Sequence, residues 1–459
     1  MNFTNGSIRL LISIIIIAVI SLSSACADQT NKTTTTDDAK EATTRTAATN
    51  STASQSSTVA PSTTTANGST TVATSEVAPT TSALEFFPPV ENREPETDYT
   101  PAFSGQTRSP GLRTKTPYNS TVISDDLKSP WGIAVLPDNR LVITEKGGAI
   151  RIAKVRGELS DRITGFPELD TRSQGGLLDV APAPDFTESR LLYFTFSELT
   201  GAGSATAVGR ARLNEAETAL ENFEKLFTAT PYYNNGLHFG SRIVFDSNGN
   251  LFVSTGERSN ATVRQNAQLL DNGFGKIFYL TAAGEPVTGS PWVKGRQVWP
   301  EIYSYGHRNV QGLDIHPETG ELWASEMGPR GGDELNLIKP GLNYGWPVIS
   351  YGIEYSGLAV GEGKTTDANI EQPVYYWDPV LAPSGMTFYR SENIPEWENN
   401  LFIGGLAGQH ISRLVLANNR VVGEERLLAE EGQRFRDLTE LDGNLYAITD
   451  SGRLYKIGK

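Results

Sequence analysis

The sequence contains little of the chemistry on which many binding sites depend, with one cysteine and four histidines in 459 residues. A single cysteine excludes a disulfide framework within the chain and a metal site built from several thiolates. The small number of histidines disfavours a histidine-rich metal centre. Any metal in this protein should therefore be a hard ion bound by oxygen ligands.

Positive charge is also scarce. The chain has 39 basic and 53 acidic side chains, which gives a formal net charge of −14 and an isoelectric point of about 4.9. An acidic surface repels phosphate backbones, so the composition predicts no nucleic-acid partner. The 44 glycines and 25 prolines are typical of a globular protein with many turns.

Residues 1–27 are typical of an export signal, because a basic residue precedes a short apolar run and small residues follow it. The end of this segment resembles a lipoprotein lipobox in which Cys26 carries a lipid anchor, although Ser23 stands where leucine is usual. Ordinary cleavage after Ala27 and retention without cleavage are the alternatives. We therefore expect an exported protein of the periplasm or cell envelope, anchored through Cys26.

Residues 28–109 consist mainly of threonine, serine and alanine, with scattered acids and prolines. Such a segment has too few apolar side chains to offset the entropy lost on ordering the chain. It is predicted to be a disordered Thr/Ser-rich tether that precedes a folded domain over residues 110–459.

One pattern recurs six times in the predicted domain. Each copy has alternating apolar residues, a turn, and a second apolar segment that ends at a small or acidic residue. The copies occupy residues 131–145, 178–197, 241–256, 312–326, 385–404 and 436–450.

Each copy is typical of a β-hairpin, and a further apolar strand follows several of them. Six units in about 350 residues (459 − 109) give roughly 58 residues each, enough for a four-stranded blade. Isolated hairpins are marginally stable, so the units must pack against one another. The pattern therefore predicts an all-β fold, a six-bladed β-propeller, with an irregular β-sandwich as the alternative. The insertions 199–237 and 330–376 are expected on one face, where sites usually lie.

Polar residues cluster where the predicted blades begin. His238 is a candidate general base, because the pKa of imidazole lies near neutral pH. Arg434 and Arg436 alternate along one strand, so their side chains should point the same way. With Arg308 they form a set of arginines that suits a polycarboxylate or phosphate ligand.

The chain from residue 129 to 457 resembles the soluble quinoprotein glucose/sorbosone dehydrogenases, and among them the bacterial aldose sugar dehydrogenases that use pyrroloquinoline quinone. The resemblance depends most on GHRNVQGL at 306–313, EMGPRGGDELN at 326–336 and NYGWP at 343–347. It implies a six-bladed propeller that oxidises aldose sugars at C1 to lactones by hydride transfer to the quinone.

The resemblance also implies roles for single residues. His238 would be the base that takes the proton from the anomeric hydroxyl, with Gln174 beside the base and the sugar. Arg308 would face the quinone oxygens and stabilise the charge that develops there. Asn309 would hydrogen-bond to the same ring system.

Further matched positions would hold the cofactor and its metal. Arg434 and Arg436 correspond to the pair that binds the cofactor carboxylates. Gly328 and Pro329 correspond to positions whose backbone carbonyls bind Ca²⁺, which is ordinary chemistry for this ion.

Asp333 and Glu334 are candidates for a second, structural calcium site, with a merely solvated acidic pair as the alternative.

The chain also departs from the family pattern. Leu237 replaces an acidic residue before the base, so that side offers nothing to orient His238. Residues 405–409 lack a lysine that contacts the cofactor in the glucose-specific branch, which leaves that contact unassigned.

Two other functions remain open at this point. A propeller hydrolase of the lactonase type would need a metal held at the axis by carboxylates and asparagine, and it has no use for three guanidinium groups around one cavity. A non-catalytic carbohydrate-binding propeller would need no convergence of histidine, arginine and asparagine.

For the dehydrogenase, the expected partners are aldose sugars and an electron acceptor, either a quinone or a cytochrome.

Overall fold

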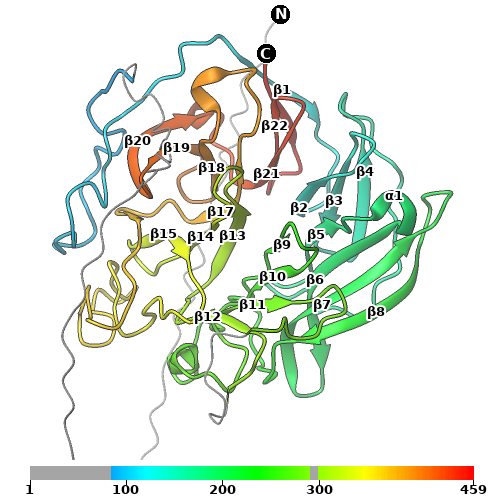
Figure 1. Cartoon of the computed structure of the whole chain (residues 1–459), viewed down its shortest axis with the longest axis horizontal. Coiled ribbons are helices and arrows are strands. Elements are labelled where there is room, and N and C mark those ends of the chain that lie inside the picture. The colour runs from blue at the N-terminus through cyan, green and yellow to red at the C-terminus, as the bar shows by residue number, and fades with distance from the viewer. Residues whose placement is uncertain (1–83, 290–297) are drawn as a thin grey trace, which may run out of the picture. The chain divides into compact units, whose positions relative to one another are not determined.

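A computed structural model describes residues 84–289 and 298–459, which form six antiparallel β-sheets around a common axis (Figure 1). The predicted all-β six-bladed propeller is confirmed. The innermost strands of the blades, in chain order, are β2 (Pro130–Val135), β5 (Leu177–Pro182), β9 (Ile243–Phe245), β13 (Val310–Ile315), β17 (Pro383–Phe388) and β21 (Phe435–Leu441). Neighbouring innermost strands contact one another, and β21 contacts β2, so the ring is closed.

The six predicted hairpins are the first two strands of the six blades. The second strands are β3 (Leu141–Glu145), β6 (Leu191–Thr200), β10 (Leu251–Ser254), β14 (Leu322–Glu326), β18 (Leu401–Gly405) and β22 (Asn444–Thr449). The third strands are β4 (Ala149–Ala153), β7 (Gly203–Leu213), β11 (Lys276–Leu280), β15 (Asp333–Ile338), β19 (Ile411–Ala417) and β23 (Leu454–Gly458).

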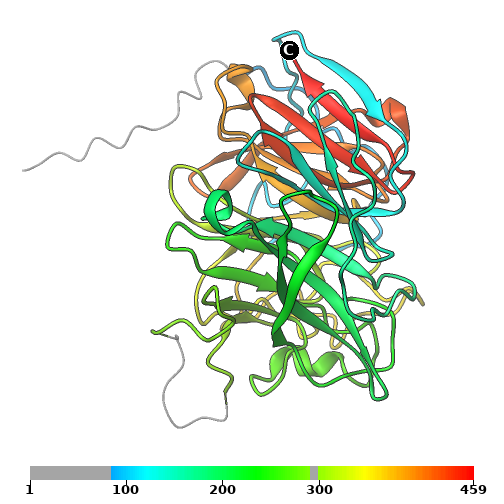
Figure 2. The same cartoon turned by 90° about the vertical axis from the view of Figure 1, so that its right-hand side faces the viewer.

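The outermost strands include the one that closes the ring. They are β8 (Leu220–Thr228), β12 (Ile302–Tyr305), β16 (Tyr375–Trp377), β20 (Arg420–Leu427) and β1 (Asn119–Ser124). The last of these, β1, pairs antiparallel with β23, so the two ends of the propeller complete one blade together (Figure 2). The first blade has three strands, and single bridges from residues 159 and 163 cover the outer edge of β4.

Helical structure in the described residues is limited to short turns. These are α1 (Phe186–Ser189) and the 3₁₀ turns η2 (Arg264–Gln268), η3 (Pro395–Trp397) and η4 (Ala429–Glu431). No helix among the described residues is long and apolar enough to cross a membrane.

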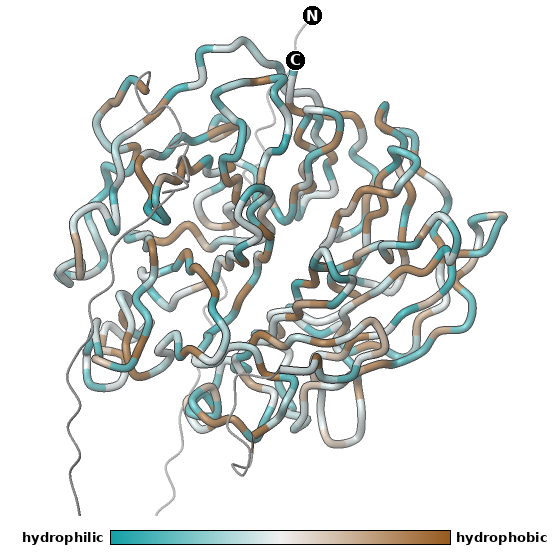
Figure 3. Tube along the Cα trace, in the orientation of Figure 1, coloured by the Kyte–Doolittle hydropathy of each residue, from teal (hydrophilic) through white to brown (hydrophobic). Residues whose placement is uncertain are grey.

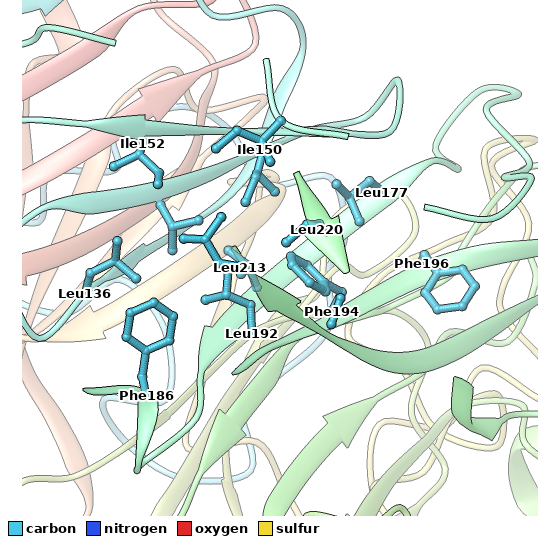
Figure 4. Close-up of a cluster of buried hydrophobic side chains, with 14 of the residues drawn as sticks. Leu136, Ile150, Ile152, Leu177, Phe186, Leu192, Phe194, Phe196, Leu213 and Leu220 are labelled. Carbon is cyan, nitrogen blue, oxygen red and sulfur yellow. The ribbon is translucent and has the colours of Figure 1, made fainter. Parts of the chain in front are cut away.

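Apolar side chains are buried between adjacent blades, where the hydropathy trace shows apolar positions along the strands (Figure 3). The interface of the first two blades packs Leu136 and Ile150 against Leu177, Phe194 and neighbouring residues (Figure 4). Five similar clusters fill the other five interfaces. Burying one such side chain contributes about 1.5–3 kcal/mol, which is how marginal hairpins become a stable ring.

Charged residues, rather than apolar ones, join the innermost strands at the axis. The guanidinium of Arg242 donates to Asp179 at 3.1 Å and to Asp437 at 2.6 Å. Asp179 and Asp437 also accept the backbone N–H groups of Ile243 and Ile133, each from the next blade, at 3.0 and 2.9 Å. The network therefore connects the first, second, third and sixth blades through hydrogen bonds.

The position of Asp179 also explains why residue 132 is a glycine. A Cβ on Gly132 would lie 2.5 Å from Oδ1 of Asp179, closer than real Cβ atoms approach. Only glycine allows the second blade's carboxylate to reach the strand of the first blade.

Residues 84–109 differ from the prediction of a disordered tether, because they lie against the propeller. The buried Gln106 side chain donates to the carbonyl of Pro373 at 2.9 Å, and Asp378 accepts the N–H of Glu96 at 2.7 Å. Hydrogen bonds to distant residues hold this segment, and composition does not reveal such contacts. The predicted signal at 1–27, including Cys26, and the tether up to residue 83 lie outside the described residues.

We expect Arg242→Met to destabilise the propeller by about 3–5 kcal/mol, because it leaves two buried carboxylates without a counter-charge. Urea unfolding followed by tryptophan fluorescence measures this as a lower midpoint. Arg453→Met, which removes a solvent-exposed guanidinium 3.5 Å from Glu431, is the matched control and should leave the midpoint close to that of the wild type. Equal midpoints for the two variants would contradict the importance of the axial network.

Candidate active site

A cavity of about 400 Å³ is lined by residues at the starts of the first strands and the ends of the second strands. These positions meet at one end of the axis because the two strands of each hairpin are antiparallel. Every blade contributes to the wall, through Trp131, Gln174, Phe239, Asn309, Ala382 and Arg436 among others.

The structure brings the predicted polar residues together. Gln174, Asn309, Arg434 and Arg436 line the cavity directly. His238 lies behind Gln174, whose side-chain oxygen accepts the backbone N–H of His238 at 2.7 Å.

His238 is held by a carboxylate that the sequence analysis did not identify. Its Nδ1 lies 2.6 Å from Oε1 of Glu257, and both side chains are buried. The backbone of Glu257 donates to the carbonyl of Arg308 at 2.9 Å, which connects the histidine to the fourth blade. Thus Glu257, rather than position 237, orients the candidate base.

The loop that carries His238 has an unusual backbone conformation. His238 has φ +49°, a left-handed value that is uncommon outside glycine. Arg258 stabilises this turn, since its Nε donates to the carbonyl of Leu237 at 3.0 Å and its guanidinium carbon lies 4.1 Å from the centre of the Phe239 ring. A Cβ at position 256 would lie 2.2 Å from the carbonyl oxygen of His238, so Gly256 is required for this approach.

The electrostatic surroundings keep His238 neutral. Burial lowers the pKa of His238, the positive charge of Arg308 lowers it further, and Glu257 opposes both effects. The imidazole is therefore uncharged near pH 7. Because the Glu257 carboxylate is an acceptor, it takes the hydrogen bond from Nδ1–H and leaves a lone pair on Nε2.

Arg308 does not line this cavity but a smaller adjoining pocket, which it shares with Gly328 and Pro329, and the end of β14 fixes it there. Glu326 accepts its backbone N–H at 2.7 Å, and its Nη1 donates to the carbonyls of Met327 and Gly328 at 2.9 and 2.6 Å. Its guanidinium carbon is 5.1 Å from the centre of the Trp346 ring. Its buried Nε has no hydrogen-bond partner among the described residues, so one donor of this cation is available to a ligand.

Arg434 and Arg436 point the same way, as their spacing predicts. Both bind Asp450, with Nε–carboxylate distances of 2.8 Å for each arginine. Burial raises the pKa of Asp450, but the two arginines outweigh burial and hold it below its ordinary value. The pair therefore presents two guanidinium groups that share one negative charge, beside the apolar side chains of Trp131 and Phe239.

The predicted calcium loop is buried and well connected. Asp333 accepts the N–H of Gly328 at 2.8 Å and those of Leu381 and Ala382 at 2.8 and 2.6 Å. These contacts hold the turn at Gly328 and Pro329 in place. Backbone carbonyls in such a turn fit the oxygen preference of Ca²⁺.

A second calcium at Asp333 and Glu334 does not fit these contacts. The described residues contain no group of three or more His, Cys, Asp or Glu side chains that could hold a metal. Burial raises the pKa of Asp333 to about 6, and burial together with Glu326 raises the pKa of Glu334. Both oxygens of Asp333 already accept backbone N–H groups, which leaves them less available to a metal. Asp333 is not solvated as the alternative supposed, because it is buried and bonded to amides, whereas Glu334 is only half-buried.

Four functional residues were not predicted from the sequence: Glu257, Glu326, Asp450 and Lys146, of which Asp450 and Lys146 line the cavity. All four lie at or just past the end of a second strand, where the repeat ends in a small or acidic residue. The repeat pattern therefore contained a signal for Glu326 and Asp450, with which two of the copies end, whereas Glu257 lies one residue past the third copy.

Comparisons with known proteins agree with this geometry. A family model described as glucose/sorbosone dehydrogenase matches residues 127–456. The aldose sugar dehydrogenase YliI of Escherichia coli is 42% identical over 345 residues, which cover 74% of this chain and 92% of that protein. The quinoprotein glucose dehydrogenase B of Acinetobacter calcoaceticus is 26% identical and covers 73% of this chain and 86% of that protein.

A solved structure extends the likeness to three dimensions. The PQQ-bound form of the aldose sugar dehydrogenase from Streptomyces coelicolor has a TM-score of 0.62 and 26% identity, and covers 75% of this chain and 99% of that one. With a family model over most of the propeller and a relative at 42% identity, the chain belongs to the glucose/sorbosone dehydrogenase family.

Proposed function

We propose that the protein is an aldose dehydrogenase that oxidises the C1 carbon of aldose sugars to lactones, with pyrroloquinoline quinone and Ca²⁺ as cofactors. Family membership and the quinone-bound Streptomyces relative support the proposal. The observation that carries it is that Gln174, Arg434 and Arg436 line one cavity. The neutral, carboxylate-bound His238 contacts Gln174, and Arg308 lines the adjoining pocket that shares Met327 with this cavity.

The residues present fit the cofactor. The cavity of about 400 Å³ has apolar walls at Trp131 and Phe239 for a flat ring system and guanidinium groups for carboxylates. When bound, the quinone supplies the acceptor for the C1 hydride, and the metal supplies a Lewis acid. Gly328 and Pro329 would hold Ca²⁺ through their carbonyls, and the Gly328 oxygen would use its second lone pair because the first accepts from Nη1 of Arg308.

His238 does the proton chemistry in this proposal. Its free Nε2 accepts the proton of the anomeric hydroxyl, and Glu257 stabilises the imidazolium that forms. Gln174 fixes the backbone of the base, and its position on the wall allows it to contact the sugar. Arg308 and Asn309 bind and orient the quinone, with the free Nε of Arg308 as a donor.

The axis argues against the hydrolase alternative. A lactonase-type site would need a metal at the centre, held by carboxylates and asparagine. Here the two axial carboxylates, Asp179 and Asp437, are bound by the guanidinium of Arg242. A cation is therefore already in place where the metal would lie.

Reconstitution tests the proposed function. Purified protein is mixed with pyrroloquinoline quinone and Ca²⁺, an aldose is added, and the bleaching of an artificial dye is followed. Bleaching that needs both additions is the expected result. The variant His238→Ala should still bind the quinone, but its turnover should fall at least about 100-fold because the general base is removed. Lactone hydrolysis without quinone would instead support the hydrolase, and neither activity would support a binding protein.

Glu257→Gln should change the pH dependence of the reaction. The carboxylate raises the pKa of His238, so its loss should lower that pKa further and move the acid limb of kcat/KM to lower pH. The maximal rate should fall by about tenfold or more, because a neutral amide stabilises the imidazolium less. Glu198→Gln, outside the cavity, is the control. A reduced rate with an unmoved acid limb would show that Glu257 acts only on the fold.

The proposal includes export through residues 1–27 and a lipid anchor on Cys26, which the lipobox-like segment supports. Cys26→Ser should release the protein from the membrane fraction of the producing cell into the soluble envelope fraction. A wild-type protein found only in the soluble fraction would contradict the anchor.

A further inference from the structure

Lys146 lies in the wall of the active-site cavity and has a fixed backbone. It follows β3 directly, donates its N–H to the carbonyl of Ser129 at 3.1 Å and accepts the N–H of Leu177 at 3.0 Å. A Cβ on Gly176 would lie 2.3 Å from the carbonyl oxygen of Lys146, so the second blade packs tightly onto this backbone. Only the side chain of Lys146 is therefore free to adjust to a ligand.

The ammonium group has donors to spare. Nζ donates to the carbonyl of Ser173 at 2.6 Å. No carboxylate of residues 84–289 or 298–459 forms a salt bridge with it. An ammonium group has three donors, so two remain after this contact.

The charge of the cavity wall is unbalanced. Lys146, Arg434 and Arg436 contribute three positive charges, and Asp450 contributes one negative charge, which leaves 3 − 1 = +2 on the wall. Burial lowers the pKa of Lys146, the positive charge of Arg436 lowers it further, and Asp450 opposes both effects. An anionic ligand would offset the excess positive charge of this wall.

We propose that Lys146 is a third cation that binds the carboxylates of the quinone cofactor together with Arg434 and Arg436. This inference rests on the proposed function. Pyrroloquinoline quinone carries three carboxylates, and the two guanidinium groups already share the charge of Asp450. In the sixth blade, Asp450 offsets part of the positive charge of Arg434 and Arg436, and Lys146 of the first blade adds a further positive charge. The first and last blades would therefore both bind the cofactor, where they meet to close the ring.

A binding titration tests this role without measuring turnover. Pyrroloquinoline quinone is titrated into the full chain in the presence of Ca²⁺, and binding is followed by quenching of tryptophan fluorescence. We expect Lys146→Ala to raise Kd by about tenfold or more and Lys146→Arg to stay within about threefold of wild type, because arginine keeps the charge. Lys154→Ala, an exposed lysine of the same blade outside the cavity, should bind as wild type does.

The trimethyl ester of the quinone separates charge pairing from a change in shape. The ratio of Kd values between Lys146→Ala and wild type should fall towards one with the ester, because the ester has no carboxylates. An unchanged Kd for Lys146→Ala, or an equal loss with acid and ester, would overturn the role of Lys146 while leaving the proposed function intact. A wild-type protein that binds no quinone would overturn the proposed function and this role together.

Discussion

The guanidinium of Arg242 at the propeller axis is the contact on which the active site depends most. It binds carboxylates from the second and sixth blades, and its Nε donates to the carbonyl of Gln311 in the fourth. Its Nη2 also donates to the carbonyl of Arg436, a cofactor-binding candidate, at 3.2 Å. Its guanidinium carbon lies 4.2 Å from the centre of the Trp131 ring in the cavity wall. One buried cation thus holds both the innermost strands and the floor of the cavity.

Around the cavity, acidic side chains at the ends of second strands likewise hold functional residues in place through hydrogen bonds. Glu257 binds His238, Glu326 binds the backbone of Arg308, and Asp450 binds Arg434 and Arg436. In each of these three hairpins the acid lies at or just past the end of the second strand, and its partner precedes the first strand or lies at its start. Antiparallel pairing makes these positions neighbours, so each blade can supply a basic group together with the carboxylate that orients it.

The same geometry explains what the sequence could and could not predict. The hairpins were predictable because both strands and the turn lie within about 20 residues, and the alternation of apolar residues marks them. The pairing of Glu257 with His238 was in principle accessible, because both flank one hairpin. Lys146 was not, because its place beside Arg436 depends on closure between the first and last blades. Residues 84–109 were misjudged because polar contacts to residues near 375, far along the chain, hold them.

The contrast between the acidic protein and its cationic cavity bears on how an anionic cofactor is bound. A net charge of −14 repels a polycarboxylate at long range, although salt screens this repulsion beyond about 8–10 Å. Within the cavity, burial reduces screening, so the excess of cations at Lys146, Arg434 and Arg436 acts at short range. Selectivity for the ligand then follows from the positions of the three cations rather than from the overall charge of the protein. A small anion can contact one of these cations, whereas a rigid ring with several carboxylates can contact all three.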